Sequence, residues 1–230
     1  RCGIAATYGN GDLGTIYFPN LSILQGEFFP HNGRLIWTGR TDWVVNNLIA
    51  SNGWVRFPSN NFAGLTVSNT FQIMGTNAIV ESWFTNISCG RLIITNNAQL
   101  YVYAHPTNGL PDSDFYGAYV RIAEDLIVGP SGCLYPVSFT TNGGSVYFSA
   151  GNLYVSTGGV ISASGLGFLR GINSVGYSVH GHGPGRGTAT SNCGSGAGYG
   201  GRGGRSSNTV ARGATYGDPL RPLYTKSGGA

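Results

Sequence analysis

Between residues 34 and 163 the chain is a succession of short apolar segments, and no stretch has the pattern of a helix. Each segment is rich in Val, Ile, Leu, Tyr, Phe or Trp and is bounded by Gly, Asn, Pro or Ser, which is typical of β-strands. No amphipathic stretch reaches the roughly 11 residues that a helix would need. The sequence therefore predicts an all-β fold. The expected strands are Arg34–Trp37, Trp43–Asn46, Gly53–Phe57, Leu65–Ser68, Thr70–Met74, Ala78–Glu81, Trp83–Ile87, Arg91–Thr95, Gln99–Tyr103, Ala118–Ile122, Asp125–Val128, Cys133–Val137, Ser145–Ser149, Asn152–Ser156 and Val160–Ala163.

The composition excludes two other classes of protein. Only 10% of the residues are charged, against about 25% in an average protein. A coiled coil or helical bundle is excluded because Lys226 is the only lysine and only three glutamates occur. A charged disordered chain is excluded because 41% of the residues are hydrophobic, enough to form a packed core.

The short spacing between the expected strands favours one all-β architecture over another. A sandwich of hairpins has longer strands joined by tight two-residue turns. A parallel β-helix has short strands, one coil per roughly 20 residues, and Asn or small residues at its corners. Residues 65–103 and 145–163 follow the second pattern. We expect a parallel β-helix, with a β-sandwich or jelly roll as the alternative.

Glycine and charge divide the chain near Gly165. Residues 1–164 hold 20 of the 39 glycines and residues 165–230 hold 19. Six arginines and eight acidic residues give the first part a net charge of −2, whereas the second part carries +6. We expect an N-terminal arm or cap over residues 1–32, a β-helical body over 33–164 and a Gly-rich basic segment over 165–230.

The Gly-rich segment has two interpretations. It holds 15 glycines between Gly165 and Gly204, which is compatible with a flexible linker. However, glycine alternates there with Tyr, Arg, His and Ala, and glycine permits close approach of backbones. Extended or polyproline-II-like strands that pack together are the ordered alternative. The Arg-Gly-Gly elements also occur in RNA-binding segments, but we expect no nucleic-acid partner.

The cysteines and the glycosylation sequons indicate an oxidising compartment. The four cysteines include no CxxC pair, so we expect two disulfides among Cys2, Cys89, Cys133 and Cys193, with buried thiols as the alternative. Sequons begin at Asn20 and Asn86. No run of 18 apolar residues occurs, so no membrane-spanning segment is expected. These features predict a secreted glycoprotein, extracellular or at the cell surface.

The C-terminal third carries a resemblance to a known superfamily. Residues 152–165, the Gly-rich repeats, residues 214–219 and residues 227–229 together resemble a pattern in large surface and extracellular proteins. Those proteins contain right-handed parallel β-helices of the pectin-lyase-like superfamily, interrupted by a Gly-rich segment. The resemblance covers about residues 150–230, and it implies a surface, adhesive or fibre role rather than catalysis.

Residues that could support catalysis or metal binding are few. Gly181-His182-Gly183 is similar to a motif of polygalacturonases, but the other acidic motifs of that family are missing, so we expect no enzymatic activity. Asp112 and Asp114 could bind Ca²⁺, but such residues more often cap a turn. His180 and His182 lack a third metal ligand at a suitable spacing. We expect neither a metal nor a cofactor.

Low charge, abundant aromatic residues and short strands together predict assembly. We expect a structural subunit of an extracellular or cell-surface filament, assembling head-to-tail with identical subunits through strand and edge contacts. The acidic-leaning body and the basic segment would attract each other. The alternative is a polysaccharide-binding or polysaccharide-cleaving β-helix protein, with glycans as partners.

Overall fold

The computed structural model describes residues 14–18, 26–30, 33–37, 42–58, 64–106, 116–141, 144–171, 180–190, 193–198, 202–205 and 210–215. These residues contain strands and turns but no helix, as the sequence predicts. The chain forms two compact units, which are described separately below. Unit 1 comprises residues 1–103, 118–136 and 147–162, and unit 2 comprises residues 104–117, 137–146 and 163–230.

Unit 1 is built from two parallel sheets, here called sheet A and sheet B. Sheet A has the order β1-β3-β6-β8-β10-β12-β14 and sheet B the order β13-β11-β9-β7-β5-β2, with β4 also pairing with β7. The strands of sheet A are β1 (Thr15–Phe18), β3 (Gly33–Trp37), β6 (Trp54–Phe57), β8 (Ile79–Ser82), β10 (Gln99–Tyr103), β12 (Cys133–Val137) and β14 (Val160–Ile161). Those of sheet B are β2 (Glu27–Phe28), β4 (Trp43–Val45), β5 (Asn47–Ser51), β7 (Gly64–Met74), β9 (Asn86–Thr95), β11 (Ala118–Val128) and β13 (Val146–Val155).

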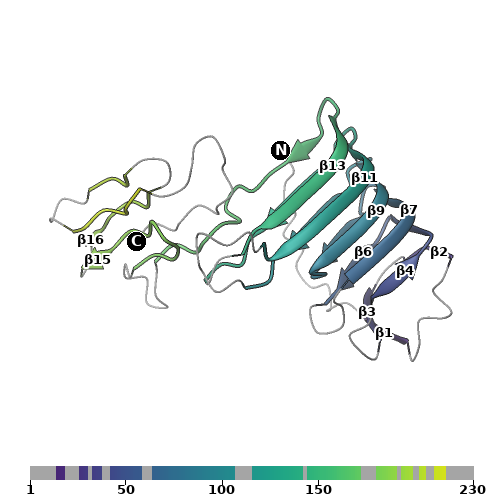
Figure 1. The fold of residues 1–230 in the computed structure, drawn as a ribbon, viewed down its shortest axis with the longest axis horizontal. Coiled ribbons are helices and arrows are strands. Elements are labelled where there is room, and N and C mark those ends of the chain that lie inside the picture. The colour runs from purple at the N-terminus through teal and green to yellow at the C-terminus, as the bar shows by residue number, and fades with distance from the viewer. Residues whose placement is uncertain are drawn as a thin grey trace. The chain divides into compact units, whose positions relative to one another are not determined.

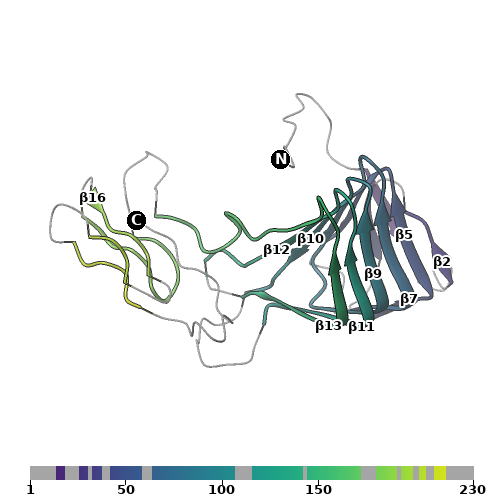
Figure 2. The same ribbon diagram turned by 90° about the horizontal axis from the view of Figure 1, so that it is seen from above.

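From β5 onward the chain alternates between the two sheets, so that each strand pairs with the next strand of its own sheet. Figures 1 and 2 both show β7, β9, β11 and β13 side by side in chain order. In sheet A, Val80 lies beside Val55 on one side and beside Leu100 on the other. Every strand pair for which a register is known in the two sheets is parallel. This arrangement is compatible with the expected parallel β-helix and does not fit the hairpins of the β-sandwich alternative.

The long strands of sheet B each combine two strands that the sequence predicts separately. In β7 the register shifts between Val67 and Thr70, and in β11 between Ile122 and Leu126. Such an irregularity bends a strand without ending its hydrogen bonding. The apolar residues on both sides of each bend are buried, so one long strand contributes to two parts of the core.

Asparagines with positive φ form the turns between the sheets. Asn52, Asn96 and Asn97 have φ angles of 51°, 57° and 63°, which Asn tolerates better than most residues. Gly75 has a φ of +104°, and a Cβ there would lie 2.1 Å from Asn52 Oδ1. These turns explain why the expected strands end at Asn and Gly.

Unit 2 holds its described segments together mainly through backbone contacts. Its only described strands are β15 (Ala189–Thr190) and β16 (Cys193–Gly194), which pair antiparallel. Backbone N–H groups of Gly196, Gly203 and Gly213 donate to carbonyl oxygens of Gly204, Gly213 and Gly196, at 3.0, 3.1 and 3.0 Å. We call residues 180–190, 193–198, 202–205 and 210–215 the glycine bundle. Backbone spacing therefore organises this part of the Gly-rich segment.

The unit boundaries and the expected domains differ in two respects. Strands β1 and β2, which lie within residues 1–32, pair with β3 and β5 and so extend the same two sheets. Residues 104–117 and 137–146, which lie within the expected body, belong to unit 2. The division at Ser162 lies close to the point where glycine content and charge change.

Candidate functional site

The core of unit 1 consists of rows of apolar side chains that run across the strands of each sheet. In sheet B, Leu92 of β9 lies beside Phe71 of β7 and Leu126 of β11. These three side chains are at most 3% exposed. Stacking of like side chains along a row buries apolar area in every coil, which is the main source of stability for such a fold.

The rows of sheet B become exposed at β13. The backbone N–H of Ser156 donates to the carbonyl oxygen of Val128 at 2.9 Å, which places Val155 beside Val128 and Leu153 beside Leu126. Val128 is fully buried, whereas Leu153 is 57% exposed and Val155 is 49% exposed. The core rows therefore continue into side chains that no next coil covers.

Sheet A ends in the same way at β14. Ile161 lies beside Leu134 of β12, and Val160 lies beside Cys133. Leu134 is 1% exposed, but Ile161 is 43% exposed and Val160 is 38% exposed. We call the exposed apolar side chains of β13 and β14 between residues 153 and 161 the C-terminal edge. It comprises Leu153, Tyr154, Val155, Val160 and Ile161.

The first strands of the two sheets form an opposite edge. Ile16 of β1 lies beside Leu35 of β3, and Ile16 is 44% exposed while Leu35 is 2% exposed. Tyr17 of β1 and Phe29, which follows β2, are 56% and 55% exposed. We call Ile16, Tyr17 and Phe29, together with strands β1 and β2, the N-terminal edge. One strand from each sheet thus forms the border at either end.

The outer face of sheet A carries aromatic rings that stack on one another. The rings of Trp83 and Tyr103 are 3.9 Å apart and 3° from parallel, and those of Tyr101 and Tyr135 are 4.5 Å apart and 18° from parallel. Because these rings stack across neighbouring strands, the aromatic row stabilises the register of the coils.

An ion pair lies in the same outer row. Arg56 Nε donates to Glu81 Oε2, and the Arg56 guanidinium is 5.1 Å from the centre of the Trp54 ring. Burial, followed by the charge of Glu81, raises the pKa of Tyr103 to about 12. Arg56 and Glu81 therefore form a partly buried ion pair that links neighbouring strands β6 and β8.

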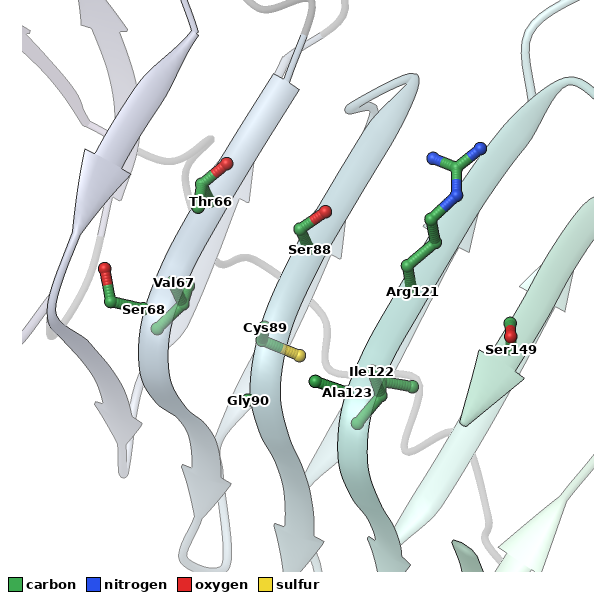
Figure 3. A pocket seen from close by; sticks show the side chains of 10 residues that line it. All are labelled: Thr66, Val67, Ser68, Ser88, Cys89, Gly90, Arg121, Ile122, Ala123 and Ser149. Atoms are coloured by element: carbon green, nitrogen blue, oxygen red, sulfur yellow. The ribbon is translucent and has the colours of Figure 1, made fainter. Parts of the chain in front are cut away.

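A shallow groove of about 340 Å³ crosses the bends of β7, β9, β11 and β13 (Figure 3). It is lined by small and apolar side chains together with Arg121, and no carboxylate or histidine lines it. Arg121 Nη1 donates to Asn86 Oδ1 at 3.2 Å, and its guanidinium is 4.7 Å from the Tyr119 ring centre. The described lining residues thus include no pair of carboxyl groups of the kind that glycoside hydrolysis uses.

Of the two predicted glycosylation sites, only Asn86 lies among the described residues. It is exposed at the start of β9, on the outside of sheet B. Its Oδ1 accepts from Arg121, and its Nδ2 is 3.5 Å from Thr85 Oγ1. Asn20 lies outside the described residues. Glycosylation at both positions stays a prediction.

The expected disulfides do not form at the two cysteines whose side chains are described. Cys89 is a buried thiol on the inner side of β9, and the Cys133 thiol lies 3.9 Å from the carbonyl oxygen of Ser131. Both occupy core positions, which corresponds to the buried-thiol alternative. Burial raises the pKa of Cys89 to about 12. Cys2 and the side chain of Cys193 lie outside the description, so their pairing stays a prediction.

The histidine motif lies in unit 2, whose described residues include no Asp or Glu. The His182 backbone N–H donates to the carbonyl oxygen of Leu169 at 3.1 Å, and His180 Nδ1 accepts from the backbone N–H of Ala189 at 3.0 Å. Asp112 and Asp114 lie outside the described residues. Within the part of the chain that the structure describes, no three metal-ligating side chains come together.

The sequence predicted assembly through strand and edge contacts, but it identified neither the strands of the two edges nor the residues of the aromatic row. Trp83 and Tyr103 are 20 residues apart, which matches the length of one coil, so aromatic residues at that spacing were a usable signal. The exposed edges had no such signal in the sequence. Leu92 is buried and Leu153 is exposed, although both lie in segments of similar composition. Only the strand order shows which coil is the last.

Comparisons with protein-family models, curated proteins and solved structures gave no match. Among the described residues, no helix is long and apolar enough to cross a membrane. The functional proposal below therefore rests on the exposed apolar side chains at the two edges of unit 1.

Proposed function

We propose that this protein is a structural subunit of an extracellular or cell-surface filament, built on a parallel β-helix and assembling head-to-tail with copies of itself. The observation that carries the proposal is the exposure of core rows at the C-terminal edge, where Leu153 is 57% exposed beside its buried neighbour Leu126. An exposed strand edge with apolar side chains favours pairing with another strand.

A second copy fits this edge better than an unrelated partner for a geometric reason. Strands β13 and β14 are at one end of sheets B and A, and β2 and β1 are at the other end of the same sheets. Stacking one copy on the next would let β14 meet β1 and β13 meet β2. Each sheet would continue in parallel, and the exposed side chains of both edges would be buried.

Apolar burial supplies the driving force for this contact. Fully burying a large aliphatic side chain contributes about 1.5–3 kcal/mol. The C-terminal edge offers Leu153, Val155, Val160 and Ile161, which are 38–57% exposed. The paired backbone hydrogen bonds would add geometric specificity. A glycan at Asn86 would lie on the outer face of sheet B, away from the stacking edges.

The test compares assembly of the native chain with two variants by electron microscopy and analytical ultracentrifugation. Leu153→Asp with Ile161→Asp places charge on both sheets of the C-terminal edge and should abolish filaments. Leu169→Asp is the matched control, because Leu169 is 49% exposed but belongs to unit 2. A native chain that stays monomeric, or equal loss of filaments in both variants, would refute the proposal.

A further inference from the structure

Exposed arginines alternate with buried glycines in the glycine bundle. Arg186, Arg202 and Arg212 are exposed, whereas the described glycines next to them in the chain, Gly185, Gly187, Gly203 and Gly213, are buried. The alternation recurs at Gly185–Arg186–Gly187, Arg202–Gly203 and Arg212–Gly213. Glycine thus occupies the inner positions, and arginine projects from the same backbone into solvent.

The backbone beside each of these arginines is fixed by a hydrogen bond to another segment. The carbonyl oxygen of Gly185 accepts a hydrogen bond from the Gly198 N–H at 2.8 Å. The Gly203 N–H donates to the carbonyl oxygen of Gly213 at 3.1 Å, and the Gly213 N–H donates to that of Gly196 at 3.0 Å. Side chains on a fixed backbone lose less entropy when they bind a ligand.

The segments approach so closely that only glycine fits at the inner positions. A Cβ on Gly203 would lie 2.0 Å from the carbonyl oxygen of Gly196, and a Cβ on Gly213 would lie 2.2 Å from that of Gly185. The buried hydroxyl of Ser195 joins two further segments, because it donates to the carbonyl oxygen of Ala211 at 2.7 Å and accepts from the Thr188 N–H at 2.9 Å.

Positive charge is uncompensated in this unit as far as the structure describes it. Arg170 and Arg205 are also exposed, and the described residues of unit 2 include no Asp or Glu. In unit 1, by contrast, Arg56 and Arg91 both pair with carboxylates. Arginines without acidic neighbours attract anions from solution.

We propose that the arginines of the glycine bundle form a binding surface for acidic polysaccharides, chains that carry uronate carboxylates or sulfate esters. The planar guanidinium donates two parallel hydrogen bonds to such groups. The fork of the guanidinium matches the carboxylates and sulfate esters of an anionic sugar chain, and single-stranded nucleic acid, whose binding relies on aromatic stacking, is the competing ligand in the test. The proposal is independent of filament formation.

The experiment measures binding of the full chain to polygalacturonate and to heparin, with neutral dextran and single-stranded DNA of equal charge as comparisons. We expect both acidic glycans to bind, dextran not to bind, and affinity to fall as salt rises. Replacing Arg186, Arg202 or Arg212 by Gln should weaken binding about two- to fivefold each. The triple variant should weaken it more than about tenfold.

Arg91→Gln on β9 is the matched control, because it removes the same charge from an exposed arginine of unit 1. It should leave glycan binding unchanged. The chain with Leu153→Asp and Ile161→Asp should also bind normally, which separates this proposal from filament assembly. Absence of glycan binding at low salt, equal weakening by Arg91→Gln, loss of binding in the edge variant, or tighter binding to DNA would each overturn the proposal.

Discussion

The two units of this chain use extended backbone in opposite ways. In unit 1, rows of Leu, Ile, Val and Phe lie between two sheets of parallel strands, and the two sheets are separated by the side chains they bury. In the glycine bundle, the segments approach until a Cβ would lie about 2 Å from a neighbouring carbonyl oxygen. One region is stabilised by apolar side chains, and the other by backbone hydrogen bonds and the absence of side chains.

The comparison teaches that opposite changes in side-chain volume damage the two regions. Removing side-chain volume should damage unit 1, because it leaves a cavity. Adding volume should damage the bundle, because there is no space for it. Four predictions follow this contrast, and hydrogen exchange resolved along the sequence can report on each unit in the same sample.

Leu92→Ala tests the side-chain core most strongly. Leu92 is fully buried between Phe71 and Leu126, so its truncation should cost about 2–5 kcal/mol of unfolding free energy in unit 1. Protection of the glycine bundle should not change. Leu153→Ala, in the same row but 57% exposed, should cost well under about 1 kcal/mol in the monomer. Equal costs at the two positions would contradict the exposed-edge description.

Alkaline pH should also act on unit 1. The pKa of Cys89 rises from its ordinary value of 9.0 to about 12, and that of Tyr103 from 10.0 to about 12, in both cases chiefly through burial. Both groups hold their protons more tightly when folded. The contribution of Cys89 is therefore complete below pH 9 and is lost as pH rises from about 9 to 12, on the order of 4 kcal/mol. Tyr103 is partly exposed, so solvent screening makes its loss, between about pH 10 and 12, smaller. Denaturant melts of the native chain and Cys89→Ala should diverge over this range, and parallel curves would contradict the prediction.

Gly213→Ala tests the opposite side of the comparison. A Cβ there would lie 2.2 Å from the carbonyl oxygen of Gly185 and 2.6 Å from the Gly198 nitrogen, so the bundle should lose about 1–3 kcal/mol. Gly204→Ala is the control, because nothing lies within 4 Å of its Cβ position. Hydrogen exchange in residues 193–215 should rise in the first variant only. If hydrogen exchange rises equally in both variants, close backbone spacing does not determine the stability of the bundle.

Glu124→Gln should have the smallest effect. Arg91 Nε is 2.7 Å from Glu124 Oε2, but both side chains are more than half exposed. We expect a loss of about 0–1 kcal/mol that disappears in high salt. Thermal melts at low and high salt measure this loss of unfolding free energy. A larger loss that does not depend on salt would contradict the prediction that this exposed ion pair contributes little to the stability of unit 1.

The sequence was sufficient to predict the strands, because apolar segments bounded by Gly and Asn form strands in almost every predicted position. Five described strands were not predicted. Four of them, β1, β2, β15 and β16, lie in the expected arm and Gly-rich segment, and the fifth is β5 (Asn47–Ser51), which follows β4 with only Asn46 between them. The bends within β7 and β11 were not predictable, since Ser68-Asn69 resembles a turn although the strand continues through it.

The candidate site was less predictable than the fold. Exposure of Leu153 depends on its belonging to the last coil, and that follows from strand order rather than from local composition. Burial of Cys89 likewise depends on the strand phase, because a shift by one residue would place it outside. The glycine bundle depends on contacts between segments such as Gly196 with Gly213, whose pairing no local pattern encodes.

The order in which the chain visits the two units has a mechanical consequence. The boundaries given above mean that the backbone crosses between them five times, after residues 103, 117, 136, 146 and 162. Within unit 2 these excursions are joined by backbone hydrogen bonds, such as Ala104 to Val137 and Ser138 to Leu166. A tensile force applied to unit 2 would therefore be shared among several successive turns of unit 1 instead of peeling away its last strand.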